Sequence, residues 1–288
     1  MPPLKRVDGT PVIEPQSKAE LFAEKFANKY ALAPFVEHLH VADLVAILEC
    51  RHFIRSRVAL KVLQRLDVCS ATGPDGLPGR ILKECTQVLA PVFARIAACI
   101  LRDGAWPLLW RTHWLHSLLK RSVIYNAANY RAIHLITVSS KIIERCILNL
   151  VSDKLMQSGA FGASQWAYQP KRSCNGLLAL LISTWLLAFS RGLKINLLLT
   201  DISGAFDKVD ISILLRKLRR ARLDDTFVKF FQSYLSPREA LVIVAGSKSA
   251  ALIVANQILQ GTICGPILWN VSLAMLMLQL FRPGFVPA

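Results

Sequence analysis

The sequence predicts an α+β protein in which helices pack on an antiparallel sheet. Segments with apolar residues at helical spacing recur along the 288-residue chain. Two other stretches, 116–136 and 240–256, are rich in β-forming residues, and the second contains the turn Gly246-Ser247-Lys248, so both are predicted to form hairpins. Hydrophobic residues make up 53% of the chain, which is enough for a sizeable core.

The charge favours a polyanionic partner. Thirty-five Lys and Arg residues against 19 Asp and Glu give a net charge of +16, so nucleic acid is the first candidate and an anionic membrane surface the second. The longest apolar run, 176–189, is shorter than the ~20 residues of a membrane span, and we interpret it as a buried helix. The scattered Cys residues, 7 in number, form no CxxC pair, which favours reduced thiols in an intracellular protein and disfavours a zinc site.

The first third of the chain is predicted to be mainly helical. Residues 18–66 have a helical pattern, and we interpret 1–69 as a helical appendage. Turn-forming residues at 72–79 predict a loop, followed by an amphipathic helix around 89–100 that ends near Gly104. Tryptophans then recur every four residues, at 106, 110 and 114, and this spacing favours a stripe in the core over a base-stacking surface.

The predicted hairpin at 116–136 carries the basic residues Lys120, Arg121 and Arg131. Basic side chains on such a hairpin suit the binding of phosphate groups, although a solvated face is an equally good interpretation of the residues alone. A further helix is predicted at 142–155.

The segment 197–209 contains the most informative chemistry. Its apolar start, Leu197 to Leu199, predicts a buried strand that ends at Asp201, and a turn then leads to Phe206 and Asp207. A strand that delivers a carboxylate to its end can present a metal ligand, and a basic chain favours phosphoryl transfer assisted by a divalent metal. The alternative is that the two carboxylates are a cap and a surface charge.

The last third alternates helices with a hairpin. Asp210 is a suitable N-cap for a helix whose basic residues gather at its C-terminal end. The hairpin at 240–256 follows, and the loop 260–266 leads into a final helix at 267–280.

Several blocks of sequence together resemble the reverse transcriptase domain of non-LTR (LINE-type) retrotransposons. They occur in that family's order over about residues 70–270. The blocks are Gly73-Pro74-Asp75-Gly76; Trp110-Arg111 with Leu118-Leu119-Lys120; Asn129-Tyr130-Arg131-Ala132-Ile133; Gln165 with Tyr168-Gln169-Pro170-Lys171-Arg172-Ser173; Asp201 to Asp207; Ser233-Tyr234-Leu235 with Arg238; and Gln260-Gly261 with Gly265-Pro266.

The resemblance implies a right-hand polymerase, an RNA-directed DNA polymerase (nucleotidyltransferase) that acts by a two-metal mechanism. Fingers with part of the palm would occupy 70–195, and a partial palm without a thumb 196–288. The implied partners are an RNA template, a DNA primer and a deoxynucleoside triphosphate, in the nucleus or in a cytoplasmic ribonucleoprotein, with no membrane.

The resemblance also assigns roles to single residues. Asp201 would be catalytic, as the first carboxylate that binds Mg²⁺ or Mn²⁺, and the Ile202 carbonyl would be a further metal ligand. Phe206 would be the steric gate that crowds a 2′-hydroxyl, and the small Ala205 would let the backbone approach the triphosphate. Asp207 would brace the turn.

The remaining implied roles concern the nucleotide. Lys120 and Arg131 would neutralise triphosphate charge, and Gln260 and Gly261 would lie in the loop that positions the incoming nucleotide and the template.

One departure from the family pattern shapes our expectation of activity. The family's next element carries Tyr/Phe-x-Asp-Asp, but residues 267–288 contain neither Asp nor Glu. Asp224-Asp225 is better interpreted as a loop between helices. We therefore expect a truncated domain, inactive alone. The alternatives are a non-catalytic RNA- or DNA-binding remnant and an RNA-directed RNA polymerase, against which Phe206 argues.

Overall fold

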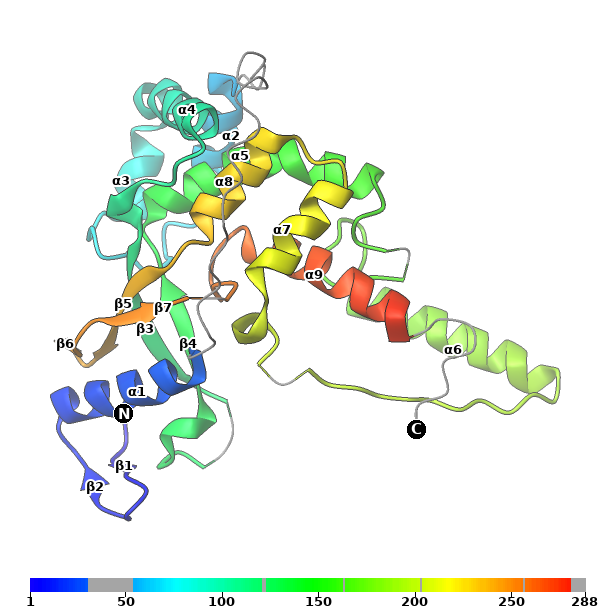
Figure 1. Cartoon of the computed structure of the whole chain (residues 1–288), viewed down its shortest axis with the longest axis horizontal. Helices are drawn as coiled ribbons and strands as arrows, with labels where there is room; N and C mark the ends of the chain where they lie inside the picture. The colour runs from blue at the N-terminus through cyan, green and yellow to red at the C-terminus, as the bar shows by residue number, and fades with distance from the viewer. Residues whose placement is uncertain (31–53, 121–122, 163, 203, 256, 281–288) are drawn as a thin grey trace.

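The computed structural model describes residues 1–30, 54–120, 123–162, 164–202, 204–255 and 257–280, without the side chains of 275–280. Helices surround a central sheet, so the predicted mixture of helix and sheet is confirmed (Figure 1). The predicted last helix is α9, Gly265–Leu280. The tail 281–288 and part of the predicted helical segment 18–66 lie outside the described residues.

The central sheet has five strands in the order β4-β3-β5-β6, with β7 also paired to β5. Both predicted hairpins form. The first joins β3 (Thr112–Leu119) to β4 (Tyr130–Leu135), and the second joins β5 (Arg238–Val244) to β6 (Ser247–Lys248) and β7 (Leu252–Val254).

The prediction of an antiparallel sheet is wrong at one pair of strands, because β3 and β5 run parallel. Parallel neighbours need a long crossover connection, which the helices between β4 and β5 provide. The two hairpins are therefore joined side by side through β3 and β5, and the sheet is mixed.

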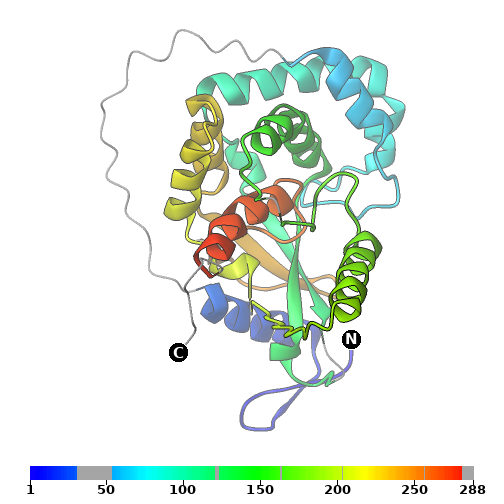
Figure 2. The same cartoon turned by 90° about the vertical axis from the view of Figure 1, so that its right-hand side faces the viewer.

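Helices on one side of the sheet build the larger core around α5, Val138–Gln157. Figure 2 shows α5 (green) nearly along its axis, with α4 (cyan) and α8 (gold) beside it. The tryptophan stripe is confirmed as core at Trp106, which is buried and makes edge-on ring contacts with Phe230 and Tyr234. The other helices of this core are α2 (Ser56–Gln64), α3 (Gly79–Glu84), α4 (Thr86–Asp103), α7 (Ile211–Arg220) and α8 (Asp225–Tyr234).

Two helix ends form as the sequence predicts. Gly104 ends α4 in the left-handed conformation, with φ of 62°. The Asp210 side chain caps α7 and accepts a hydrogen bond from the Ile213 amide over 3.0 Å.

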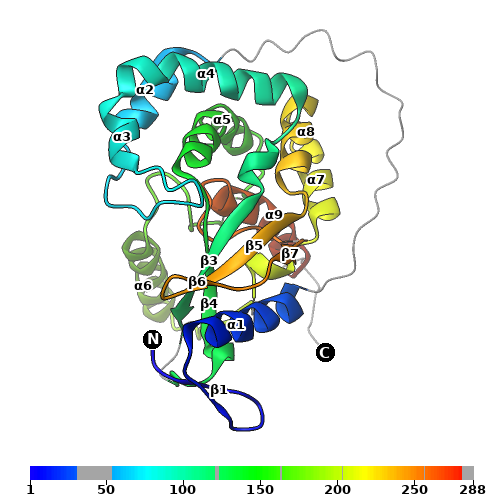
Figure 3. The same cartoon turned by 90° about the vertical axis from the view of Figure 1, so that its left-hand side faces the viewer.

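The N-terminal residues pack against the other side of the sheet. In Figure 3 the sheet lies between α1 (Pro15–Tyr30) and the helices α4 and α5. The buried Phe22 of α1 meets Tyr130 of β4 edge-on, with 5.0 Å between ring centroids, and a short hairpin of β1 (Leu4–Lys5) and β2 (Pro11–Val12) adjoins the same core. Residues 4–30 thus contribute to the sheet's core. The predicted appendage 1–69 and the boundaries at 69/70 and 195/196 stay predictions.

The prediction of a buried helix at 176–189 is wrong. Helix α6 (Cys174–Ser190) forms, capped by the Ser173 hydroxyl, but none of its residues is buried. Figure 1 shows α6 projecting from the body of the molecule. An apolar sequence predicts burial only if something covers it, and the described part of the chain leaves every residue of α6 at least partly exposed. Within that part, no helix is long and apolar enough to cross a membrane.

The buried strand predicted at Leu197 to Leu199 is also absent. These residues are extended but belong to no strand, and the three leucine side chains are exposed. Apolar residues form a strand only when a neighbouring strand accepts their backbone hydrogen bonds, and no described segment pairs with this one. Asp201 is therefore delivered by an exposed segment rather than by the rim of the sheet.

Candidate functional site

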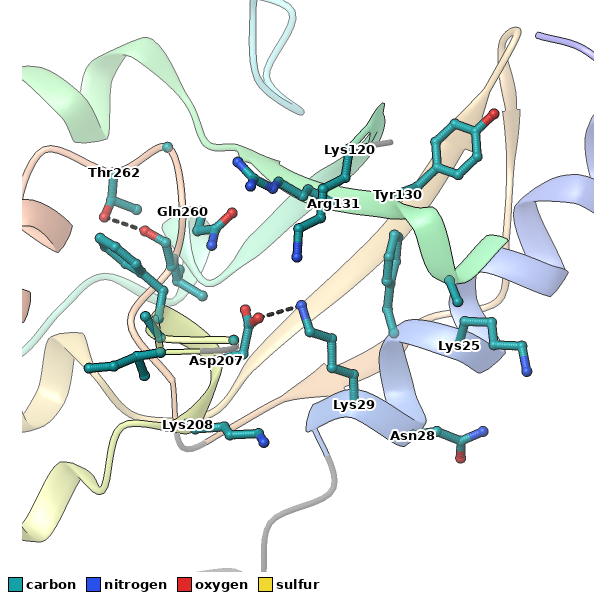
Figure 4. A pocket seen from close by; sticks show the side chains of 18 of the residues that line it. Lys25, Asn28, Lys29, Lys120, Tyr130, Arg131, Asp207, Lys208, Gln260 and Thr262 are labelled. Carbon is teal, nitrogen blue, oxygen red and sulfur yellow. Dashed lines mark hydrogen bonds and ion pairs between the residues drawn. The ribbon is translucent and has the colours of Figure 1, made fainter. Parts of the chain in front are cut away.

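A pocket of about 860 Å³ gathers the residues to which the sequence assigned roles (Figure 4). They come from the β3–β4 hairpin, the segment 201–208 and the loop before α9, and α1 supplies one wall. The lining includes Lys120, Arg131, Asp201, Ile202, Ala205, Phe206, Asp207, Gln260 and Gly261.

The β3–β4 hairpin supplies two of the cations. Lys120 follows β3, and its amide donates to the Asn129 carbonyl over 2.7 Å, while Arg131 pairs with Leu118 across the ladder. Both side chains are exposed. Their position on paired strands fixes the backbone from which each cation reaches into the pocket. Arg121, predicted beside them, lies outside the described residues.

The turn that carries Phe206 is held from several sides. A short 3-10 helix, η4 (Phe206–Lys208), places the half-buried ring of Phe206 in a stack on Trp269 of α9, with centroids 5.4 Å apart and planes 21° apart. The Phe206 carbonyl accepts a hydrogen bond of 2.9 Å from the Ile258 amide.

The two carboxylates of this segment have different environments. Asp201 is exposed at the pocket, whereas Asp207 is buried and forms an ion pair with Lys29 of α1. The Asp207 amide also donates to the Gly204 carbonyl over 3.0 Å, which closes the turn. Asp201 is thus the carboxylate that remains accessible to a ligand.

The loop before α9 is tied to β4. The His134 amide donates to the Gln260 carbonyl over 2.8 Å, which extends the hydrogen bonding of β4 onto the loop. Gly261 has φ of +106°, and a Cβ there would lie 2.7 Å from the His134 carbonyl oxygen. Only glycine satisfies both conditions at this position.

A buried carboxylate supports the same loop from beneath. Glu144 of α5 is fully buried, and its Oε2 accepts from the amides of Ile263 and Cys264 over 2.7 and 3.1 Å. Burial raises the pKa of Glu144, while the nearby Arg238 and the two amides oppose that rise. Glu144 thereby fixes the backbone that connects the pocket loop to α9.

The arrangement agrees with comparison to known proteins. Residues 118–282, more than half of the chain, match the family described as reverse transcriptase (RNA-dependent DNA polymerase). The chain belongs to this family. The resemblance to LINE-type reverse transcriptase domains seen in the sequence blocks is therefore confirmed.

Similar curated proteins come from transposable elements. A putative 115 kDa protein of the type-1 retrotransposable element R1DM of Drosophila melanogaster is 27% identical over 231 residues, which are 77% of this chain and 22% of the relative. A probable RNA-directed DNA polymerase from transposon BS of the same species is 25% identical over 222 residues, 77% of this chain and 24% of the relative. The 149 kDa protein of transposon TX1 of Xenopus laevis is 23% identical over 262 residues, 88% of this chain and 20% of the relative. The chain spans about a quarter or less of the length of these relatives.

The donor set of this reverse transcriptase domain fits one metal ion better than two. Among the described residues, no three His, Cys, Asp or Glu side chains gather as a metal site. Asp224 is paired with Lys154, and neither it nor Asp225 lines the pocket. The interpretation of this pair as a loop between helices holds only in part, because Asp224 is the N-cap of α8 and Asp225 is its first residue. Magnesium is often held by one carboxylate together with phosphate oxygens of a substrate, and the exposed Asp201 suits that arrangement.

The wall contributed by α1 was not predicted from the sequence. Lys25, Phe26, Asn28 and Lys29 line the pocket of the reverse transcriptase domain, although residues 1–69 were interpreted as an appendage without informative chemistry. Lys25 and Lys29 lie one helical turn apart, next to the buried Phe22 and Phe26. Two lysines at that spacing beside an apolar face were the available signal, but the same pattern is typical of any solvated helix edge.

A pair of buried histidines next to the pocket loop predicts a pH dependence of stability. His134 Nδ1 and His113 Nε2 are 2.7 Å apart, and burial lowers the pKa of His113 to about 3 and that of His134 well below its ordinary value. The unfolded chain therefore binds more protons than the native one below pH ~6.5. The free energy of unfolding should fall by about 2–3 kcal/mol from pH 7.5 to pH 5.5.

Urea denaturation at a series of pH values measures this dependence. His134→Phe should flatten the slope, whereas substitution of the exposed His116 by Gln should leave it unchanged. Equal slopes for the protein and for His134→Phe would show that other groups cause the loss.

Proposed function

We propose that the pocket binds the incoming deoxynucleoside triphosphate of an RNA-directed DNA polymerase, whose nucleic-acid partners are an RNA template and a DNA primer. The observation that carries the proposal is the convergence of three separate sequence blocks, the β3–β4 hairpin, the segment 201–208 and the loop 259–266, on one pocket. The transposon BS relative, described as a probable RNA-directed DNA polymerase, supports the same activity.

The charge of the pocket suits a triphosphate. Its cationic side chains are Lys25, Lys29, Lys120, Arg131 and Lys208, and its carboxylates are Asp201 and Asp207. Within the described part of the chain, Lys29 is the one of these cations that forms an ion pair. Lys120, directly after β3, and Arg131, on β4, are therefore proposed to bind the phosphate oxygens.

Asp201, with the Ile202 carbonyl, is proposed to hold Mg²⁺ or Mn²⁺ next to those phosphates. When bound, the ion neutralises phosphate charge. Ala205 leaves room for the triphosphate beside the backbone, and Gln260 and Gly261 form the wall against which the base and the template rest. The pairing of Asp207 with Lys29 supports its role in bracing the turn.

Magnesium-dependent binding of dATP tests the metal and nucleotide assignment. Asp201→Asn removes the exposed carboxylate with little change of shape, so the affinity for Mg²⁺-dATP should fall at least tenfold, about 1.4 kcal/mol or more. The matched control is Asp225→Asn, which removes one exposed carboxylate outside the pocket. Isothermal titration with and without Mg²⁺ gives the affinities, and equal Mg²⁺-dependent binding by Asp201→Asn would contradict the assignment.

Selection against ribonucleotides tests the proposed gate. The Phe206 ring is held in place by its stack on Trp269, so a sugar that carries a 2′-hydroxyl should clash with the Phe206 ring. Phe206→Ala should raise the affinity for ATP relative to dATP about tenfold or more. An unchanged ratio of the two affinities would remove Phe206 from this role and, with it, the argument against an RNA-directed RNA polymerase.

A second candidate is binding of RNA or DNA without polymerisation. The lining of the pocket favours this candidate in one respect, because its cations outnumber its carboxylates. Among the described residues that line the pocket, Asp201 is the one carboxylate without an ion pair. Salt-dependent binding of an RNA–DNA hybrid that is independent of Mg²⁺, without extension of a primer, would support this candidate. Extension of the primer that requires Asp201 would exclude it.

A further inference from the structure

The ion pair between Lys29 and Asp207 joins two parts of the pocket that are distant in sequence. Lys29 lies in the last turn of α1, and Asp207 lies in η4, directly after Phe206. Figure 4 shows the Lys29 side chain extending from α1 into the pocket toward Asp207. The pair connects the helix beneath the sheet to the turn that carries the proposed gate.

Because Asp207 is buried, its carboxylate depends on the ion pair with Lys29. Its side chain is 5% exposed, whereas that of Lys29 is 39% exposed. If Asp207 loses its cation, its negative charge is left unpaired in a medium of low polarity. Either the carboxylate then takes up a proton or the turn moves to expose it to water. Screening of the partly exposed lysine reduces the stabilisation but does not remove the requirement.

The other anchors of Phe206 leave one side of the turn to Lys29. Trp269 of α9 stacks on the ring, and the Ile258 amide holds the Phe206 carbonyl. Both contacts come from the segment 258–269. On the side of α1, the described residues give the turn a polar contact in this ion pair.

We propose that Lys29 is a positioning residue for Phe206, and that α1 is therefore a required part of the nucleotide pocket. Through Asp207, Lys29 holds η4 so that the Phe206 ring faces the sugar of the bound nucleotide. The inference rests on the proposed function, because it concerns selection between deoxyribose and ribose at the same site. Lys29 is not proposed to contact the triphosphate, because its ammonium group is already paired with the Asp207 carboxylate.

The test combines nucleotide selection with local hydrogen exchange. The variants are Lys29→Met, which keeps the aliphatic stem, Asp207→Asn, which keeps the shape, and the double variant. The matched control is Lys61→Met, which removes the same charge from an exposed position on α2 outside the pocket. Circular dichroism checks that each variant folds.

The expected result is a common change in both single variants. The ratio of dATP to ATP affinity, measured with Mg²⁺, should fall about fivefold, and the double variant should fall no further because both changes break one contact. Exchange of the Asp207 and Ile258 amides should become faster, with α5 unchanged. Lys61→Met should behave as the unmodified protein.

Two results would overturn the inference. Equal loss of dATP and ATP affinity in Lys29→Met, with stronger binding of both in Asp207→Asn, would make Lys29 a phosphate ligand instead. Unchanged exchange of the Asp207 and Ile258 amides in Lys29→Met would show that the ion pair does not hold the turn. The exchange measurement needs no ligand, so it decides the inference even if the protein binds neither nucleotide, a result that would reject the proposed function separately.

Discussion

Glu144→Ala should lower the free energy of unfolding by about 3 kcal/mol or more. The substitution removes the acceptor of two amides, the partly buried one of Ile263 and the buried one of Cys264, and leaves a cavity in the core beneath the pocket loop. Each unsatisfied buried donor costs about 1–3 kcal/mol, and the lost side-chain volume adds to this. Urea denaturation followed by circular dichroism measures the loss.

Two further variants make the interpretation specific. Glu144→Gln keeps a carbonyl oxygen as acceptor, so its loss should be about 1 kcal/mol. Glu84→Ala removes an exposed carboxylate at the end of α3 and should change stability by less than about 0.5 kcal/mol. Similar losses for the Ala and Gln variants of Glu144 would mean that packing, and not the two hydrogen bonds, accounts for its contribution.

Gly261→Ala should weaken the binding of Mg²⁺-dATP at least tenfold while the rest of the fold persists. A Cβ at this position would lie 2.7 Å from the His134 carbonyl oxygen, and φ is +106°, a conformation that alanine rarely adopts. Because the neighbouring atom is backbone, the loop itself has to move, and Gln260 moves with it. Isothermal titration measures the affinity, and circular dichroism the retained fold.

Gly246→Ala is a control that distinguishes the effect of backbone strain from the effect of a position in the pocket. Gly246 also has a positive φ, of +87°, but a Cβ there would meet nothing within 4 Å, and the residue lies in the β5–β6 turn outside the pocket. This variant should lose about 1 kcal/mol of stability and keep its affinity for Mg²⁺-dATP. Unchanged affinity in Gly261→Ala would contradict the role of the loop in holding the nucleotide.

Local patterns predicted most elements because their causes are local. Helical spacing predicted α4, α5, α7 and α9, and the Asp210 side chain caps α7 as expected. The turn expected at Gly246-Ser247-Lys248 predicted the second hairpin, although only Gly246 of the three lies in the turn and the other two form β6. The order of the family's blocks also named residues that the fold brings into one pocket. Resemblance carried that information, since nothing in the spacing of residues 120, 201 and 260 implies that they meet.

The failures concern contacts between distant segments. The exposure of α6 and of Leu197 to Leu199 could not be foreseen, because an apolar pattern does not specify what covers it. The parallel pairing of β3 with β5 depends on how the intervening helices cross the sheet. The position of α1 depends on the fit of Phe22 against Tyr130, and Lys29 reaches Asp207 only as a result of that packing.

The hydrogen bond between His134 and Gln260 has a consequence for the dimensions of the pocket. Arg131 and His134 lie on the same strand, β4, so three residue steps of about 3.3 Å set a separation of roughly 10 Å between the backbone of Arg131, the proposed phosphate ligand, and the start of the loop before α9. A β-strand resists stretching, so β4 keeps this separation constant. Under the proposed function, this constant separation would favour a nucleotide whose distance between phosphate and base matches it.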